Sequence, residues 1–261
     1  MRNNKHVIVV IVNFYSGAIN SLVELLSRNG VEVIVSNNGG GLEKVRKLDH
    51  VRVVDNRRNV GYAAACNVGV KLALERGARR LVILNPDVSI KFKDLIGLIQ
   101  SGYDISAPII SFYKKSRLFY DCGGRVNWVI GRPSHVEFTN RRRRDLGIDF
   151  VSGAVMCIKS TVFERIGMFD ETFFLYFEDV DFCRRAIRAG FSLGVVRKIV
   201  VKHMLGEVAG QNSWVKHYNN LRSNFIFIFK HVVWLFKPVA VCYCVLLSVW
   251  VAVKFLVGKI V

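Results

Sequence analysis

Residues 7–12 read VIVVIV, a continuous apolar run rich in β-branched side chains that Asn13 brings to an end. Such a run is typical of a strand buried on both faces of a parallel sheet. Three units of a predicted helix and a predicted strand follow, with helices over 16–28, 42–48 and 62–76 and strands over 31–35, 51–54 and 81–84. This alternation predicts an α/β fold with an open, mostly parallel central sheet and helices on both faces.

Polar residues stand at the ends of these predicted strands. Because ligands bind outside the carboxyl ends of the strands in open α/β sheets, we expect one cleft to gather the side chains. They are Asn13, Asn37, Asp55, Asn59, Asn85 and Asp87. No GxGxxG or GxxxxGKS/T pattern follows the first strand, which argues against a Rossmann dehydrogenase and a P-loop ATPase.

Asp87 closes the tripeptide Asn85-Pro86-Asp87 after a predicted buried strand. A carboxylate in that place is suited to a divalent ion that takes its other ligands from substrate phosphates, as Mg²⁺ commonly does. The alternative is a plain turn, because backbone geometry alone favours all three residue types there.

A second informative stretch, FEDVDFCRRAIRAG at residues 177–190, opens a predicted basic helix with Glu178, Asp179 and Asp181. Carboxylates this close repel one another unless a cation, a helix N-terminus or a shared proton offsets the repulsion. Asp179 lies beside apolar neighbours, so we predict that it is a general base with a shifted pKa. The alternative is an acidic first turn that caps the helix.

The remaining pattern predicts further elements. These are helices over 92–101 and 213–230, loops or a hairpin over 111–149, a short helix ending at 167, and strands over 105–110, 150–158, 191–196 and 199–201. Gly153 and Ala154 either let a ligand approach the backbone or allow tight packing. Thr161 and Glu164 suit a capping box. The run Arg141–Arg144 is either a solvated segment or a contact for phosphate or anionic lipid. His203 is either structural or part of the same site.

The 261-residue chain is both apolar and basic. Hydrophobic residues make up 51% of it and the mean hydropathy is +0.28, which points to a membrane-contacting part. The formal net charge of +18 implies an anionic partner such as nucleic acid, lipid headgroups or a phosphorylated substrate. The six cysteines show no CxxC spacing, and we interpret them as reduced and intracellular.

The membrane-contacting part is expected near the C-terminus, where residues 238–253 carry no charge between Lys237 and Lys254. This segment is either one short membrane span or an anchor lying in the interface, and the alternative is a buried core helix. We therefore expect a catalytic domain over 1–230 and a membrane-associated helical segment over 231–261.

Several motifs together resemble those of family-2 glycosyltransferases with the GT-A fold, and of the rhamnosyltransferase-like members in particular. They are VIVVIVNFYSG, NVGYAAACNVG, LNPD, FVSGAVMCIKSTVFERIGMFDETFFLYFEDVDFCRRAIRAGF and VKHMLG. The resemblance extends from Val7 to about Lys230. It is most specific over residues 167–190.

The resemblance implies roles for individual residues. Asp87 and His203 would hold a divalent cation, Mg²⁺ or Mn²⁺, and with it the donor diphosphate. Asp179 would be the catalytic base. Asn13, Asn37, Asn59, Gly61, Asn67, Asn85 and Asp87 would bind the donor, and Glu178, Asp181, Gly153 and Ala154 would orient the acceptor.

Three positions depart from the family pattern. Asn37 stands where the family usually has an aspartate that contacts the nucleotide base, and an amide oxygen still accepts a hydrogen bond there. Asn85 replaces the first aspartate of DxD. Val208 replaces the hydroxyl residue of HxxGxS.

The implied reaction is inverting transfer of a sugar, with rhamnose as a candidate, from a nucleoside diphosphate sugar to a hydroxyl of a lipid-linked or polysaccharide acceptor. Glu178 and Asp181 would orient that acceptor or hold Arg184 and Arg185. The apolar tail and positive charge would place the enzyme at the cytoplasmic face of the cell membrane. Two alternatives are a polyprenyl-phosphate sugar synthase of the same fold and a non-enzymatic basic protein that binds nucleic acid or membrane. Nucleic acid is not expected, because no motif for it is present.

Overall fold

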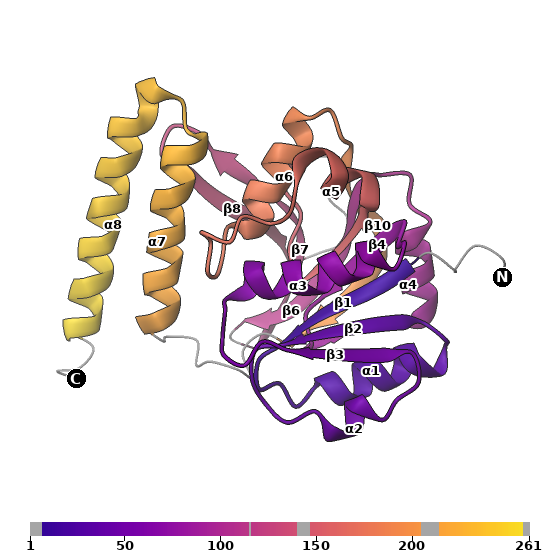
Figure 1. Cartoon of the computed structure of the whole chain (residues 1–261). Helices are drawn as coiled ribbons and strands as arrows, with labels where there is room; N and C mark the ends of the chain where they lie inside the picture. The colour runs from indigo at the N-terminus through magenta and orange to yellow at the C-terminus, as the bar shows by residue number, and fades with distance from the viewer. Residues whose placement is uncertain (1–6, 115, 140–146, 205–213, 258–261) are drawn as a thin grey trace.

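The computed structural model describes residues 7–114, 116–139, 147–204 and 214–257. The first half alternates strands and helices as the hydrophobic pattern predicts (Figure 1). Its elements are β1 (Val7–Asn13), α1 (Ile19–Arg28), β2 (Glu32–Asn37), α2 (Glu43–Arg46), β3 (Val51–Asp55), α3 (Tyr62–Glu75) and β4 (Arg80–Leu84). β1 pairs in parallel with β2 and β4, and β2 pairs in parallel with β3. The carboxyl ends of β1, β2, β3 and β4 therefore lie at the same edge of the sheet.

The second half completes one sheet of ten described strands. Its elements are β5 (Val88–Ser89), α4 (Phe92–Ile99), β6 (Ile105–Lys114), β7 (Arg117–Asn127), β8 (Arg132–Phe138), β9 (Val155–Lys159), α5 (Ser160–Ile166), α6 (Glu178–Arg188) and β10 (Leu193–His203). The strand order is β3-β2-β1-β4-β9-β6-β10-β5. β9 runs antiparallel between β4 and β6, so a parallel half is joined to a mixed half.

The sheet is covered on both faces, as predicted, and β1 shows how. Alternate side chains of a strand point to opposite faces. Ile8, Val10 and Val12 pack in one core with α3, α5 and α6. Val9 and Ile11 pack in the other core with α1 and α4. The continuous apolar run of β1 follows directly from this burial on both sides.

Several element boundaries differ from the prediction. The strand predicted over 150–158 begins at Val155, and the helix predicted over 42–48 spans Glu43–Arg46. α1 begins at Ile19 instead of residue 16, and the Ser16 backbone N–H donates to Asn13 Oδ1 instead. The capping box at Thr161 is wrong, because β9 runs straight into α5 and Lys159 is the N-cap. The two strands predicted over 191–201 are one strand, β10, with a register shift between Val196 and Val200.

The hairpin expected within residues 111–149 is confirmed as β7 and β8, which pair antiparallel. Gly124 lets this hairpin sit against the core, since a Cβ at that position would lie 2.0 Å from the Phe150 ring. The Arg141–Arg144 run lies outside the described residues.

Two helices close the described chain, α7 (Trp214–His231) and α8 (Lys237–Val257), and Figure 1 shows them side by side at one end of the sheet. They pack through Ile228, Val232, Ala240 and Cys244. Residues 234–253 have the length and composition to cross a membrane, and 17% of the most apolar stretch is buried by the protein. That low burial argues against the alternative of a core helix.

Candidate active site

Three adjoining cavities lie in a row along the carboxyl ends of the strands. We name them after one lining residue each: the Asp179 cavity of 520 Å³, the Asp87 cavity of 500 Å³ and the Asn37 cavity of 510 Å³. Tyr62 and Asn85 line both of the first two, and Asn59 lines the last two. The row therefore forms one continuous cleft. Five of the six predicted strand-end residues line it, Asn37, Asp55, Asn59, Asn85 and Asp87, whereas Asn13 is buried and bonds Asn37 from behind.

Backbone N–H groups hold the Asp179 carboxylate at the entrance to α6. Oδ2 accepts a hydrogen bond from Gly153 N–H at 2.8 Å, and Oδ1 accepts one from Val180 N–H at 2.8 Å. A Cβ on Gly153 would lie 3.2 Å from Asp179 Oδ2. Glycine at position 153 thus serves the close approach of the carboxylate.

The backbone before α6 is strained. Tyr176 and Phe177 have φ values of 68° and 71°, a left-handed conformation that costs about 1–3 kcal/mol for a bulky residue. The turn directs the first residues of α6 toward the cleft, and Tyr176 itself lines the Asp179 and Asp87 cavities. The packing of Phe177 in the core holds this conformation in place.

Two adjacent carboxyl groups differ in environment. Burial raises the pKa of Asp179, while the charge of His135 and the N–H groups of Gly153 and Val180 act in the opposite direction. Burial and the charge of Asp179 raise the pKa of Glu178 to about 8. Glu178 Oε2 has no hydrogen-bond partner among the described residues. Glu178 therefore keeps its proton near pH 7, and the two N–H donors make Asp179 the member of the pair better suited to carry the negative charge.

Asp87 and His203 meet in the Asp87 cavity. Asp87 Oδ1 lies 3.0 Å from His203 Nε2, because β5 pairs with the end of β10. No cluster of three or more His, Cys, Asp or Glu side chains suited to a metal occurs within the described ranges. Two protein ligands beside an open cavity fit an ion such as Mg²⁺, which takes most of its ligands from phosphates and water.

Amide side chains form the floor of the Asn37 cavity. Asn13 Nδ2 donates to Asn37 Oδ1 at 2.9 Å, and Asn37 Nδ2 donates to Asp55 Oδ1 at 2.8 Å. These bonds account for the amide at position 37, since an aspartate there would face the carboxylate of Asp55. The hydrogen bond from Asn37 and the charge of Arg46 lower the pKa of Asp55. Asn59 joins the same wall, accepting a hydrogen bond from Asn38.

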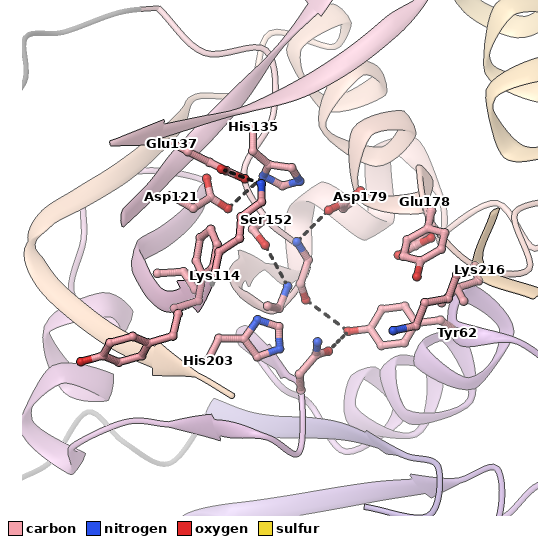
Figure 2. A pocket seen from close by; sticks show the side chains of 18 residues that line it. Tyr62, Lys114, Asp121, His135, Glu137, Ser152, Glu178, Asp179, His203 and Lys216 are labelled. Atoms are coloured by element: carbon pink, nitrogen blue, oxygen red, sulfur yellow. Dashed lines mark hydrogen bonds and ion pairs between the residues drawn. The ribbon is translucent and has the colours of Figure 1, made fainter. Parts of the chain in front are cut away.

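Gly61 and Tyr62 connect the two ends of the cleft. Gly61 has a φ of 90°, and a Cβ there would lie 2.7 Å from the Phe174 carbonyl oxygen. The Tyr62 hydroxyl lies 2.8 Å from Asn85 Oδ1 and 3.1 Å from the Gly153 carbonyl oxygen. It thereby joins the strand end beside Asp87 to the loop that holds Asp179 (Figure 2). Ala154 continues this loop, because its carbonyl accepts from Asn85 N–H.

Three predicted site residues line none of the three cavities: Asn13, which lies behind Asn37, and Asn67 and Asp181, which bond elsewhere. Asn67 uses its amide on the Phe169 backbone and on Glu171. Asp181 is fully buried and bonds Arg185, Lys230 and His231. The expectation that Asp181 holds Arg185 is confirmed.

The lining of the Asp179 cavity includes polar residues that the sequence did not reveal, among them Tyr62, Asp121, His135 and Lys216. Asp121 and His135 come from the β7–β8 hairpin and Lys216 from α7. For Asp121 and His135, the sequence shows only one acidic and one basic residue in two separate segments. It does not show the strand register that brings the two side chains together.

This fold, with a polar cleft along the carboxyl ends of its strands, fits an enzyme of the transferase class. The chain belongs to glycosyl transferase family 2, whose sequence pattern matches residues 8–167.

Characterised relatives are similar over most of the chain. The dTDP-rhamnosyl transferase RfbF of Shigella flexneri is 25% identical over 247 residues, covering 88% of this chain and 82% of the relative. The low-salt glycan biosynthesis hexosyltransferase Agl10 of Haloferax volcanii is 27% identical over 212 residues, covering 75% and 66%. The N-acetylglucosaminyl-diphospho-decaprenol L-rhamnosyltransferase of Mycobacterium tuberculosis is 24% identical over 236 residues, covering 79% and 77%.

A solved structure supports the fold. GalNAc-T7, crystallised with UDP, GalNAc and Mn²⁺, aligns with a TM-score of 0.64 at 16% identity. The alignment covers 87% of this chain, which spans about half of the GalNAc-T7 chain, 48%. The protein is thus a glycosyltransferase with the GT-A fold, and the alternative of a non-enzymatic basic protein is not supported.

Proposed function

We propose that this glycosyltransferase moves a sugar, with rhamnose as the first candidate, from a nucleoside diphosphate to a hydroxyl group of a lipid-linked or glycan acceptor, with inversion. One observation carries the proposal: the Asp179 carboxylate, held by two backbone N–H groups, lines a cavity that adjoins the Asp87–His203 pair, and Tyr62 and Asn85 line both cavities. A base and a diphosphate site next to each other are what a single displacement requires.

The row of cavities suggests how the substrates lie. The nucleoside would occupy the Asn37 cavity, where Asn37, Asp55 and Asn59 offer hydrogen-bonding groups to a base and ribose. The diphosphate would lie in the Asp87 cavity and the acceptor in the Asp179 cavity. Asn13 would support the nucleoside site through its bond to Asn37.

In the reaction, the acceptor oxygen forms a bond to the anomeric carbon while the bond from that carbon to the diphosphate oxygen breaks. Asp179 takes the proton from the acceptor hydroxyl, and the nucleoside diphosphate leaves with the bonding electrons. Gly153 N–H keeps the Asp179 carboxylate aimed at the cavity. Asp87 and His203 would hold a divalent cation, which when bound neutralises charge on the leaving diphosphate. Glu178, Gly153 and Ala154 would shape the acceptor side.

The names of the relatives suggest which substrates to test. One relative is named for dTDP-rhamnose and another for N-acetylglucosaminyl-diphospho-decaprenol. We expect a nucleoside diphosphate sugar to raise the melting temperature, more so with Mg²⁺ or Mn²⁺, because a ligand that binds only the native state stabilises it. A screen of nucleotide sugars, dTDP-L-rhamnose included, measures this.

The decisive variant is Asp179→Asn, which keeps the size of the side chain. We expect it to bind the donor with the wild-type thermal shift and to lose about 100- to 10,000-fold in transfer rate, the range for a lost general base. Asp170→Asn, a change far from the cleft, serves as the matched control. Near-wild-type transfer by Asp179→Asn would contradict the assignment of the base.

An assay with different acceptors also tests the alternative function, a polyprenyl-phosphate sugar synthase. Product formed on an N-acetylglucosaminyl diphosphate lipid supports glycan extension, whereas product formed only on a polyprenyl phosphate supports a polyprenyl-phosphate sugar synthase.

We also propose that the chain through the end of α7 forms the catalytic domain, which moves the border expected at residue 230 past His231, and that the C-terminal segment holds this domain at the cytoplasmic face of the membrane. Supporting this, Trp234, Leu246 and Trp250 are 80%, 69% and 59% exposed on one apolar helical segment. Replacing these three side chains with serine is expected to move the protein from the membrane pellet to the supernatant. Unchanged sedimentation would count against the anchor.

A further inference from the structure

The β7–β8 hairpin places a carboxylate and an imidazole in the wall of the Asp179 cavity. His135 Nδ1 lies 2.9 Å from Asp121 Oδ2. Asp121 is 7% exposed, and its other oxygen accepts the Gly123 N–H at 2.9 Å. Asp121 is therefore fixed in place, and it determines which nitrogen of the ring points to the hairpin.

The other ring nitrogen of His135 is left toward the cavity. The ring packs edge-on against Phe150, with 5.2 Å between centroids. Figure 2 shows it beside Asp179 on the same side of the cavity, with its second nitrogen turned toward the helix that carries the carboxylate. The side chain is 41% exposed, and it lines the same cavity as Asp179.

The charges around Asp179 single out this histidine. On its own helix Glu178 carries the shared proton, and on the hairpin Glu137 lies 3.6 Å from Lys114 of β6. Tyr62 of α3, His203 of β10 and Lys216 of α7 line the remaining walls of the cavity. Among these groups, His135 is the main charge that opposes the effect of burial on Asp179.

The histidine is charged at neutral pH. Burial by itself lowers the pKa of His135, but the hydrogen bond and the charge of Asp121 outweigh it and raise the pKa to about 9. His135 therefore carries a positive charge near pH 7 in the wall of the cavity that Asp179 also lines.

We propose that His135, held by Asp121, is a positioning residue that keeps Asp179 ionised in the cleft and so ready to accept the proton of the acceptor hydroxyl. The proposal rests on the proposed role of Asp179 as the base. It assigns a purpose in the reaction to the β7–β8 hairpin, which lies far along the chain from the acidic stretch.

The test is the pH dependence of dTDP release from dTDP-L-rhamnose in the presence of an N-acetylglucosaminyl diphosphate lipid. In His135→Gln the acid limb should move to higher pH, because Asp179 then faces Asp121 without a compensating cation. A shift of one pH unit would make the variant about tenfold slower on that limb and nearly equal to the wild type at higher pH. His135→Asn should give the same shift, and it serves as a second variant in case His135→Gln does not fold.

Two further variants give the sign of the effect. Asp121→Asn should move the acid limb to higher pH, as His135→Gln does, because Asp121 holds the positive charge on His135 against the effect of burial. The double variant should shift the limb less than His135→Gln alone, because the negative charge of Asp121 is then also gone. A purely structural role would make all three variants slower at every pH. Ser134→Ala, on the opposite face of β8, is the matched control and should match the wild type.

An acid limb that stays at the wild-type pH in both His135 variants would overturn the proposal. If Asp179→Asn is inactive in the same assay, that result removes only the role of His135. If Asp179→Asn keeps its activity, the proposed base itself is wrong, so the two failures are distinguishable.

Discussion

Replacing Asp181 by asparagine probes the interaction that joins α6 to α7. The Asp181 side chain is fully buried, and it lies 2.8 Å from Arg185 Nε, 2.6 Å from Lys230 Nζ and 2.7 Å from His231 Nε2. Asparagine keeps the volume but removes the charge, and it turns one of two acceptors into a donor that faces other donors.

The structure sets the size of the effect. Burial alone would raise the pKa of Asp181, but His231, Arg185 and Lys230 more than offset it and hold the pKa at about 2, against an ordinary value of 3.8. That difference corresponds to about 2 kcal/mol of stability at neutral pH. Loss of one partner from a buried ion pair typically costs about 3–5 kcal/mol. Arg185 keeps its bonds to the Ile166 and Met168 carbonyls, so we expect a loss of about 2–3 kcal/mol.

Urea unfolding of the full chain in mild detergent, followed by circular dichroism, measures this difference. Because the folded pKa of Asp181 is below its unfolded value, the stabilisation is complete above about pH 4 and is lost as the pH falls toward 2. The deficit of the variant should shrink in the same range. Asp170→Asn is the matched control, since Asp170 also binds Lys230 but is 25% exposed, and it should cost less than about 1 kcal/mol. Equal stabilities of wild type and Asp181→Asn at pH 7 would refute the reasoning.

Three more changes test the cleft. Glu178→Gln should gain stability relative to the wild type as the pH rises from about 4.5 to about 8. The raised pKa of Glu178 makes the folded wild type bind more protons than its unfolded chain in that window, so the wild type loses stability there. Thermal melts of both proteins check this, and a difference in melting temperature that stays constant with pH would contradict it. Gly153→Ala should lower the transfer rate about tenfold or more at unchanged donor affinity, because its Cβ would displace the Asp179 carboxylate; an unchanged rate would show that the carboxylate can move. Asn37→Asp should lower stability by about 1 kcal/mol, since like charges then meet at Asp55; weaker destabilisation at high salt identifies the cause.

Much of the parallel half of the fold was predictable from sequence. The runs that became β1, β2 and β4 are apolar because both of their faces are covered, and periodicity detects that burial. Because these strands pair in parallel, their carboxyl ends lie at the same edge of the sheet. The antiparallel pairing of β9 with β4 and β6 was not predictable, because the hydrophobic pattern of a strand does not indicate in which direction the neighbouring strands run.

The candidate site was predictable where residues lie close in sequence. Asp179 is at a helix entrance, as expected. Asp181 was expected to share its site, but two positions on a helix differ by about 200° in direction, and Asp181 accordingly points into the contact with α7. The pair of Asp121 and His135 depends on the register of a hairpin, which composition does not specify.

The contact between Asp181 and His231 bears on where the polypeptide may be cut. The apolar pattern suggests a border after residue 230, yet α7 runs to His231. A chain that ends at residue 230 would lack the His231 imidazole, which is an ionic partner of the fully buried Asp181 carboxylate. A soluble form for crystallisation should stop within residues 232–236, so that the last turn of α7 stays whole and the catalytic half retains its full set of ionic partners.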